Sequence, residues 1–261
     1  MGFYSQLVSH FALLIIPILT RFLSFHVEPF TPNITTDKEA LISFKSQLSN
    51  DPPHPLYSWD HNSSPCNWTG VFCNNLHDNR VVALNLSGLG LSGHISTYIG
   101  NLSFHDSLQL QNNQLTGVIP DQIDIDLLIK LEVKLGKNNL YGTIPPSLGN
   151  ISTLTNISFG TNTLSGKIPS HLGRLKNLIE LDLTINNLTG TIPPSIYNLS
   201  SLVNFALAAN DLWGEFPEDV GNRLPKLLVF RVEFLDPCTI SPTLKLSKWL
   251  TTRLMELYHQ V

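Results

Sequence analysis

Apolar residues recur in a fixed order between residues 84 and 216. Each unit starts with an apolar–x–apolar pair and continues with a leucine, a glycine two residues later, and an isoleucine or phenylalanine two residues after that. Successive glycines stand 24 or 25 residues apart. Alternation with period two is typical of a short strand that turns one face inward. The pattern therefore predicts stacked repeats that each begin with a short strand, the first of them over Val81–Leu86.

The same residue types fill the same places in all six units. The apolar pairs are Leu84/Leu86, Leu108/Leu110, Val133/Leu135, Ile157/Phe159, Leu181/Leu183 and Phe205/Leu207. The later leucines are Leu91, Leu115, Leu140, Leu164, Leu188 and Leu212, and the glycines are Gly93, Gly117, Gly142, Gly166, Gly190 and Gly214. Proline follows the isoleucine or phenylalanine in five of the six units. Such regularity indicates one repeating structural unit.

Five of the units carry an asparagine three residues after the second apolar position. These residues are Asn113, Asn138, Asn162, Asn186 and Asn210, and the first unit has Leu89 in this place. A side-chain amide both donates and accepts, so it can bond free backbone groups where the chain turns away from the strand. We therefore expect stacked copies to form an asparagine ladder.

The period, L-x-L-x-x-N-x-L-x-G-x-I-P, resembles the plant-type leucine-rich repeat. The resemblance implies an α/β solenoid: a right-handed superhelix with a parallel sheet on its concave face and short helical turns behind. No single repeat can bury its leucines alone, so stacked copies would share one core. The expected copies cover about 78–101, 102–126, 127–150, 151–174, 175–198 and 199–223, with a partial seventh ending at residue 234.

Residues 36–77 resemble the N-terminal cap of the same family. Thr36 and Glu39 have the spacing of a capping box, and Leu41, Phe44 and Leu48 share one helical face. Asn50–Pro52 would stop this helix. The stretch Cys66-Asn-Trp-Thr-Gly-Val-Phe-Cys73 is close to the family's cap signature. The resemblance implies a disulfide between these two cysteines over the edge of the first repeat.

The sequence departs from the family pattern in two places. His105 and Lys130 occupy a column that is otherwise apolar, so we expect the second and third copies to be the loosest. From Leu235 onward the pattern ends, and residues 235–261 form a divergent tail. It is either a substitute cap built on Leu250, Leu254 and Leu257 or an extension without a role. Cys238 within it is a free thiol, an intermolecular bridge or incidental.

The N-terminal residues indicate the secretory pathway. Leu7–Leu19 is mostly apolar but shorter than the roughly 20 residues that span a bilayer, so 1–27 is predicted to be a signal peptide, with an uncleaved anchor as the alternative. Sequons are numerous, as expected of a glycoprotein. The candidate glycosylation sites are Asn33, Asn62, Asn67, Asn101, Asn150, Asn187 and Asn198; Asn85 and Asn156 would lie on the strand face, where sugar would obstruct a ligand. We expect an extracellular or plasma-membrane-associated protein.

Signs of catalytic or cofactor chemistry are weak. The segment Gly88-Leu-Gly-Leu-Ser-Gly93 matches the dinucleotide-binding pattern, but Gly93 is the first of the periodic glycines and a repeat turn follows it. The nine histidines have no metal-ligand spacing, and no nucleophile elbow or kinase signature is present. A net charge of −4 gives no reason to expect nucleic acid. We expect no enzyme activity, no cofactor, no metal and no kinase in this chain.

Residues flanking the inward apolar pairs would face solvent on the concave side. The candidate ligand-binding residues are Ser107, Gln109, Gln111, Glu132, Lys134, Asn156, Ser158, Glu180, Asp182, Thr184 and Asn204, with Asn85, Ser87, Asn112, Lys137, Thr161 and Ala206 beside them. The resemblance implies a receptor-like module that binds a peptide or protein, with a leucine-rich-repeat receptor kinase as candidate co-receptor. The alternatives are a secreted inhibitor of cell-wall-degrading enzymes, which would carry a second cysteine set after the last repeat, and an inactive truncated receptor kinase.

Overall fold

The computed structural model describes residues 33–49, 55–74, 80–102, 106–121 and 131–234. The expected signal segment (1–27), the polar substitutions at His105 and Lys130, and the tail with Cys238 lie outside the described residues. In the part of the chain that is described, no helix is both long enough and apolar enough to cross a membrane.

Within the described residues, eight strands form one sheet in which every neighbouring pair but the first is parallel. They are β1 (Val71–Asn74), β2 (Arg80–Asn85), β4 (Ser107–Gln109), β6 (Leu131–Lys134), β8 (Leu154–Ser158), β10 (Glu180–Asp182), β12 (Asn204–Ala206) and β14 (Val229–Arg231). The register aligns the first apolar position of each repeat, so Leu84 is opposite Leu108 and Leu108 is opposite Val133. The predicted parallel sheet of repeated strands is confirmed, and the partial seventh repeat contributes β14.

A second sheet was not predicted from the sequence. Six strands form it in the described part of the chain, and they are β3 (Ser92–His94), β5 (Gln114–Gly117), β7 (Asn139–Gly142), β9 (Thr163–Lys167), β11 (Asn187–Gly190) and β13 (Asp211–Leu212). From the sequence, only the segments that carry the apolar–x–apolar pair of each repeat were expected to be strands. Gly117 illustrates why glycine is needed: its φ is +90°, and a Cβ would lie 2.7 Å from the His94 ring of the preceding coil.

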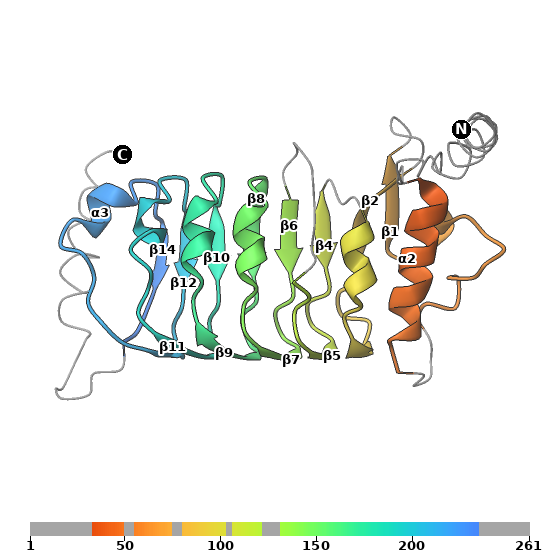
Figure 1. The fold of residues 1–261 in the computed structure, drawn as a ribbon, viewed down its shortest axis with the longest axis horizontal. Coiled ribbons are helices and arrows are strands. Elements are labelled where there is room, and N and C mark those ends of the chain that lie inside the picture. Colours follow the sequence, from red (N-terminus) through yellow and green to blue (C-terminus); the bar gives the residue numbers. More distant parts are fainter. Residues whose placement is uncertain (1–32, 50–54, 75–79, 103–105, 122–130, 235–261) are drawn as a thin grey trace, which may run out of the picture. The chain divides into compact units, whose positions relative to one another are not determined.

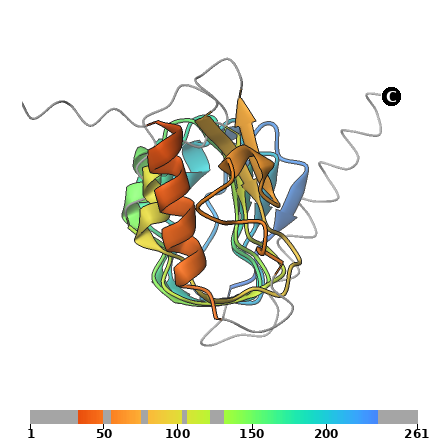
Figure 2. The same cartoon turned by 90° about the vertical axis from the view of Figure 1, so that its right-hand side faces the viewer.

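In the described coils outside the gap at residues 122–130, short helices form the side opposite the eight-stranded sheet (Figure 2). They are the 3₁₀ helices η2 (Thr97–Asn101), η3 (Pro146–Asn150), η4 (Ser170–Arg174) and η5 (Ile196–Asn198), and the α-helix α3 (Val220–Arg223). Glycine within η3 and η4 lets consecutive coils approach, since a Cβ on Gly149 would collide with His171. Figure 1 shows the coils side by side, with the cap helix at one end and α3 near the other.

The periodic apolar residues fill the space between the sheets and the helices as one cluster. Leu84, Leu108, Ile157, Leu181 and Phe205 are almost completely buried. No strand of three to five residues could bury such a row by itself. The stability of each coil therefore depends on its neighbours, as expected for a solenoid.

The N-cap of the cap helix lies three residues before the predicted one, Thr36. Helix α2 spans Ile34–Ser46, and its N-cap is Asn33. The Asn33 amide oxygen accepts hydrogen bonds from the backbone N–H groups of Thr35 (2.8 Å) and Thr36 (3.2 Å), while Thr36 Oγ1 accepts from the Asn33 backbone N–H at 2.9 Å. The predicted Thr36–Glu39 box is therefore wrong, because an asparagine cap with threonine at the third helical position satisfies the same groups earlier in the chain.

The same helix also ends earlier than predicted. It stops at Ser46 rather than at Asn50, because the following residues pair with the first repeat. The Ser49 N–H donates to the Ser92 carbonyl at 2.9 Å, and the His94 N–H donates to the Gln47 carbonyl at 3.0 Å. A tertiary pairing thus ends the helix before any local stop signal acts.

Candidate binding face

The candidate ligand-binding residues lie on the outer face of the eight-stranded sheet. Side chains alternate along each strand, so the residues between the buried apolar positions point away from the core. All eleven candidates are partly exposed. The strand registers form two rows across the sheet: the first is Ser107, Glu132, Asn156, Glu180 and Asn204, and the second is Gln109, Lys134, Ser158, Asp182 and Ala206. We refer to this surface as the outer sheet face.

The Glu180 carboxylate is fixed on the outer sheet face by hydrogen bonds from two neighbouring strands. Its two carboxylate oxygens accept hydrogen bonds from Asn156 Nδ2 at 2.9 Å and from Asn204 Nδ2 at 3.0 Å. The two asparagines come from the strands on either side of β10. This carboxylate therefore joins three repeats and is fixed before any ligand arrives.

Asp182 is fixed in a different way. Its Oδ1 accepts from the backbone N–H of Thr184 at 3.0 Å and from the Thr184 hydroxyl at 2.7 Å. Both side chains lie over Gly160 of the neighbouring repeat, where a Cβ would be 2.8 Å from Thr184 Oγ1 and 3.1 Å from Asp182 Oδ1. A larger residue at 160 would displace them, so glycine there positions the carboxylate.

Other candidates lie in the repeats on either side of β10. Lys134 forms an ion pair with Glu132 on its own strand at 2.7 Å. Gln111 Oε1 and Asn204 Oδ1 are buried acceptors without a hydrogen-bond partner among the described residues. An unmet buried acceptor costs free energy unless a donor reaches it. The face therefore combines fixed carboxylates with unused acceptors.

The turns that follow β4, β6, β8, β10 and β12 contain an unusual backbone conformation. Asn112, Lys137, Thr161, Ile185 and Ala209 all have φ between +54° and +61°. A β-branched residue in this left-handed region is a genuine outlier. Ile185 is also 55% exposed, which makes it both strained and unprotected at the edge of the outer sheet face.

Arg231 and Val229 extend the face onto β14 and were missed in the sequence. Arg231 is opposite Ala206, and Val229 is opposite Asn204. Both are exposed. The alternation of the apolar Phe230 and Val232 indicates a strand in which Val229 and Arg231 face outward. The repeat pattern ends immediately afterwards, which obscured this signal in the sequence.

The ladder asparagines join consecutive coils. Asn162 donates from Nδ2 to the carbonyl oxygens of Leu135 (3.1 Å) and Phe159 (3.0 Å), and its Oδ1 accepts from the Leu140 N–H at 3.0 Å. Asn138, Asn186 and Asn210 repeat the pattern, and all four are buried. Asn113 makes the same contacts to Leu86, Leu91 and Leu110 while partly exposed. The ladder thus holds the turn beneath the outer sheet face.

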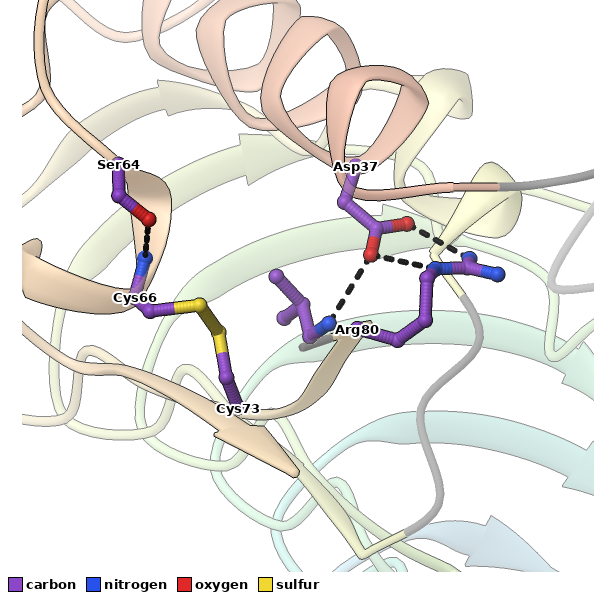
Figure 3. Close-up of a disulfide and its surroundings, with 6 residues drawn as sticks. Asp37, Ser64, Cys66, Cys73 and Arg80 are labelled. Carbon is purple, nitrogen blue, oxygen red and sulfur yellow. Dashed lines mark hydrogen bonds and ion pairs between the residues drawn. A yellow bond between two sulfur atoms is a disulfide. The ribbon is translucent and has the colours of Figure 1, made fainter. Parts of the chain in front are cut away.

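The cap closes the N-terminal end of the sheet with contacts that do not repeat. Cys66 and Cys73 form a disulfide, as the family resemblance implied. Asp37 of α2 is fully buried and accepts from Arg80 Nε and Nη2, both at 2.7 Å, and from the Val81 N–H at 2.9 Å. Figure 3 shows the disulfide and this ion pair on either side of the start of β2.

The sequons are divided between the faces of the solenoid. Asn62, Asn67, Asn150, Asn187 and Asn198 are exposed away from the outer sheet face. Asn33 is exposed, but its Oδ1 caps α2. On the outer sheet face, Asn85 is exposed, while the half-buried Asn156 uses its Nδ2 for the bond to Glu180. The Asn101 side chain is outside the described residues. A glycan on Nδ2 of Asn156 would compete with the bond to Glu180.

Perturbed titratable groups lie away from the outer sheet face. Backbone N–H groups of Asn62 and Ser63 lower the pKa of Asp60, and the hydrogen bond from Arg223 lowers the pKa of Asp219. Burial raises the pKa of Tyr197. Among the described residues, no three His, Cys, Asp or Glu side chains are grouped to hold a metal ion.

Two family models match the chain. The leucine-rich-repeat N-terminal domain covers residues 34–74, and the leucine-rich repeat covers residues 177–199. Among curated proteins, the Arabidopsis thaliana LRR receptor-like serine/threonine-protein kinase EFR is 47% identical over 89 residues, which are 34% of this chain and 8% of that protein. The chain spans only about a tenth of the length of the curated relatives it matches.

Solved structures cover more of the chain. A chain from the BIR3–SERK2 complex of Arabidopsis thaliana is 35% identical, with a TM-score of 0.59, and the match covers 67% of this chain and 94% of that one. The GASSHO1/SCHENGEN3 ectodomain in complex with CASPARIAN STRIP INTEGRITY FACTOR 2 is 34% identical with a TM-score of 0.59, covering 75% of this chain and 26% of that one.

The capped solenoid with its parallel sheet and its helical back defines a leucine-rich-repeat protein. The two matches at the cap and the repeats, together with the close match to a nearly complete ectodomain, identify the branch. The chain belongs to the plant leucine-rich-repeat receptor ectodomain family. The matched regions are ectodomain regions, which are not catalytic, and the relatives are extracellular or membrane-associated receptors.

Proposed function

We propose that residues 33–234 form an extracellular recognition module that binds a peptide or protein through the outer sheet face, without a kinase of its own. Residues 1–27 would direct it to the secretory pathway, and residues 36–77 and 78–234 would act as cap and repeat domain. The eleven candidate residues of the face would contact the ligand. A receptor kinase with leucine-rich repeats is the expected co-receptor.

The observation that carries the proposal is the fixed polar surface around Glu180 and Asp182. Both carboxylates are held by neighbouring side chains or backbone. Binding a ligand therefore costs little conformational entropy at these two side chains. The relatives support the same class of function, because the GASSHO1/SCHENGEN3 ectodomain is in complex with CASPARIAN STRIP INTEGRITY FACTOR 2 and BIR3 is in complex with SERK2.

A displayed library of random peptides, selected on the secreted full chain, tests the proposal. Selected peptides should lose binding to the Ser158→Arg variant, because Ser158 lies on the outer sheet face between Lys134 and Asp182. The matched control is Ser170→Arg, since Ser170 is exposed on η4 at the back. Peptides that bind both variants and the parent equally would place recognition elsewhere and overturn the proposal.

A further inference from the structure

Charges alternate along one row of the outer sheet face. The registers place Lys134, Ser158, Asp182, Ala206 and Arg231 side by side on β6, β8, β10, β12 and β14. The row therefore has the order positive, neutral, negative, neutral, positive. We call these five residues the charged row.

The geometry of a β-sheet sets the spacing of the charges. Neighbouring strands are about 4.8 Å apart, so charges on every second strand are roughly 9.6 Å apart. Ser158 and Ala206 are small, which leaves the spaces between the charges low. A ligand lying across the strands would meet a charge of alternating sign at each such step.

Other charged groups on the same face modify this pattern. Glu132 pairs with Lys134 at 2.7 Å, but the exposed Lys137 adds a second positive charge to the same repeat. Glu180 reinforces Asp182 on β10. Glu233 follows Arg231 by two residues, so its negative charge offsets that of Arg231. Of the three charges in the row, at Lys134, Asp182 and Arg231, the one at Arg231 is therefore the weakest. The step from positive β6 to negative β10 is therefore the dominant feature.

The conformation of a complementary peptide follows from this spacing. A polyproline II helix has three residues per turn and rises about 3.1 Å per residue, so residues three apart share a side at about 9.3 Å. In an extended strand, residues three apart point to opposite sides. An α-helix returns to the same side after seven residues, at about 10.5 Å, and so loses register over two steps.

We propose that the charged row recognises a polyproline II segment that carries an acidic, a basic and an acidic residue at intervals of three. The basic residue contacts Asp182 and Glu180, and the acidic residues contact Lys134 with Lys137 and Arg231. This inference rests on the proposed function, because it specifies the chemistry of a ligand on the same face.

Two synthetic peptides with blocked ends test the proposal against the secreted full chain. The matched probe is Pro-Glu-Pro-Pro-Arg-Pro-Pro-Glu-Pro, and the inverted probe exchanges Glu and Arg. Fluorescence polarisation should give an affinity about tenfold tighter for the matched probe, since a few exposed ion pairs together contribute about that factor. A third probe with the same composition but charges two residues apart should bind as weakly as the inverted one.

Substitutions in the charged row test whether it causes the preference for the matched probe. Asp182→Lys and Arg231→Glu should each weaken the matched probe, with Asp182→Lys having the larger effect. Asp211→Lys is the control, because Asp211 is exposed on β13 of the other sheet. Arg231→Glu keeps the test informative if Asp182→Lys disturbs the turn at Thr184.

The outcomes separate this inference from the proposed function. Equal affinity for the matched and inverted probes, or a third probe that binds as tightly as the matched one, overturns the polyproline II inference. If library peptides still depend on Ser158 in that case, the proposed function stands. If no library peptide depends on the outer sheet face, the proposed function fails and this inference fails with it.

Discussion

The junction between cap and first repeat differs in kind from the junctions between repeats. At the cap, one buried ion pair (Asp37–Arg80), one disulfide (Cys66–Cys73) and the stacked rings of Trp59 and Trp68, 5.4 Å apart, are each used once. Between repeats, the same asparagine and leucine contacts occur again and again. Unique contacts close an end, and repeated contacts extend the stack.

This difference has a consequence for how substitutions act. When one repeated contact is lost, the stack still continues on both sides of it. The buried polar groups that it joined are nevertheless left without hydrogen bonds. A unique contact at the cap has no neighbour of its kind. Damage there should expose the first coil while the later coils keep their own interfaces, because each coil contacts only the adjacent ones.

The largest effect is expected within the ladder. Asn162→Leu removes the partners of the Leu135 and Phe159 carbonyls and of the Leu140 N–H. Each unmet buried group costs about 1–3 kcal/mol, so the free energy of unfolding should fall by about 3 kcal/mol or more. Urea unfolding followed by circular dichroism measures it, and Asn186→Leu should behave alike.

Asn177→Leu is the matched control for the ladder. Asn177 donates to the Ser152 carbonyl, but it is exposed, and water can replace this bond. The expected change is therefore small. Equal losses of stability for Asn162→Leu and Asn177→Leu would contradict the importance of the ladder.

The next effect concerns the buried ion pair of the cap. Asp37→Ala removes the carboxylate that pairs with the largely buried Arg80 and accepts from the Val81 N–H. The loss should be about 3 kcal/mol, the lower end of the range for a buried pair, because Arg80 is partly exposed. Hydrogen exchange should increase first in α2 and β2, while β10 and β12 remain protected. Asp219→Ala, which removes an exposed pair with Arg223, is the control and should leave the melting temperature unchanged.

A smaller effect is expected at the disulfide. Cys66→Ser together with Cys73→Ser opens a short loop, which should cost about 2 kcal/mol because short loops restrict the unfolded chain least. Limited proteolysis should then cut within residues 55–74 before it reaches the repeats. Peptide mapping of the parent without reduction should recover the two cysteines linked. Recovery of both as free thiols would contradict the cap structure.

The repeat pattern predicted the leucine columns and the positions of the ladder asparagines, and the family resemblance implied the parallel sheet and the disulfide. The details of the cap helix were missed. Asn33 as N-cap and the early end of α2 could not be found in this way, because Ser49 and Gln47 pair with residues of the first repeat more than forty positions later. Local stop signals cannot report such a contact.

The candidate site shows the same division. Strand alternation identified the residues that face outward, including Glu180 and Asp182. It could not show that Asn156 and Asn204 both donate to Glu180, or that Gly160 makes room for Asp182, because these depend on the register between strands. The second sheet was missed because its strands span only two to five residues and do not carry the apolar–x–apolar pair that marks the strands of the first sheet.

The smallest effect sharpens the comparison within the repeats themselves. Ile185 occupies the left-handed position with φ +54° and is 55% exposed, whereas Asn112 fills the same column in an earlier repeat with a residue that tolerates this conformation. Ile185→Asn should raise the free energy of unfolding by about 1 kcal/mol, because the strain is relieved and little buried contact is lost. Thermal unfolding measures the gain, and Ile179→Asn, outside the left-handed column, should give none.

If the isoleucine is kept for ligand contact, the stabilised variant should bind the selected library peptides more weakly than the parent. A variant that is both more stable and equally good at binding would show that the strain at Ile185 serves no recognition.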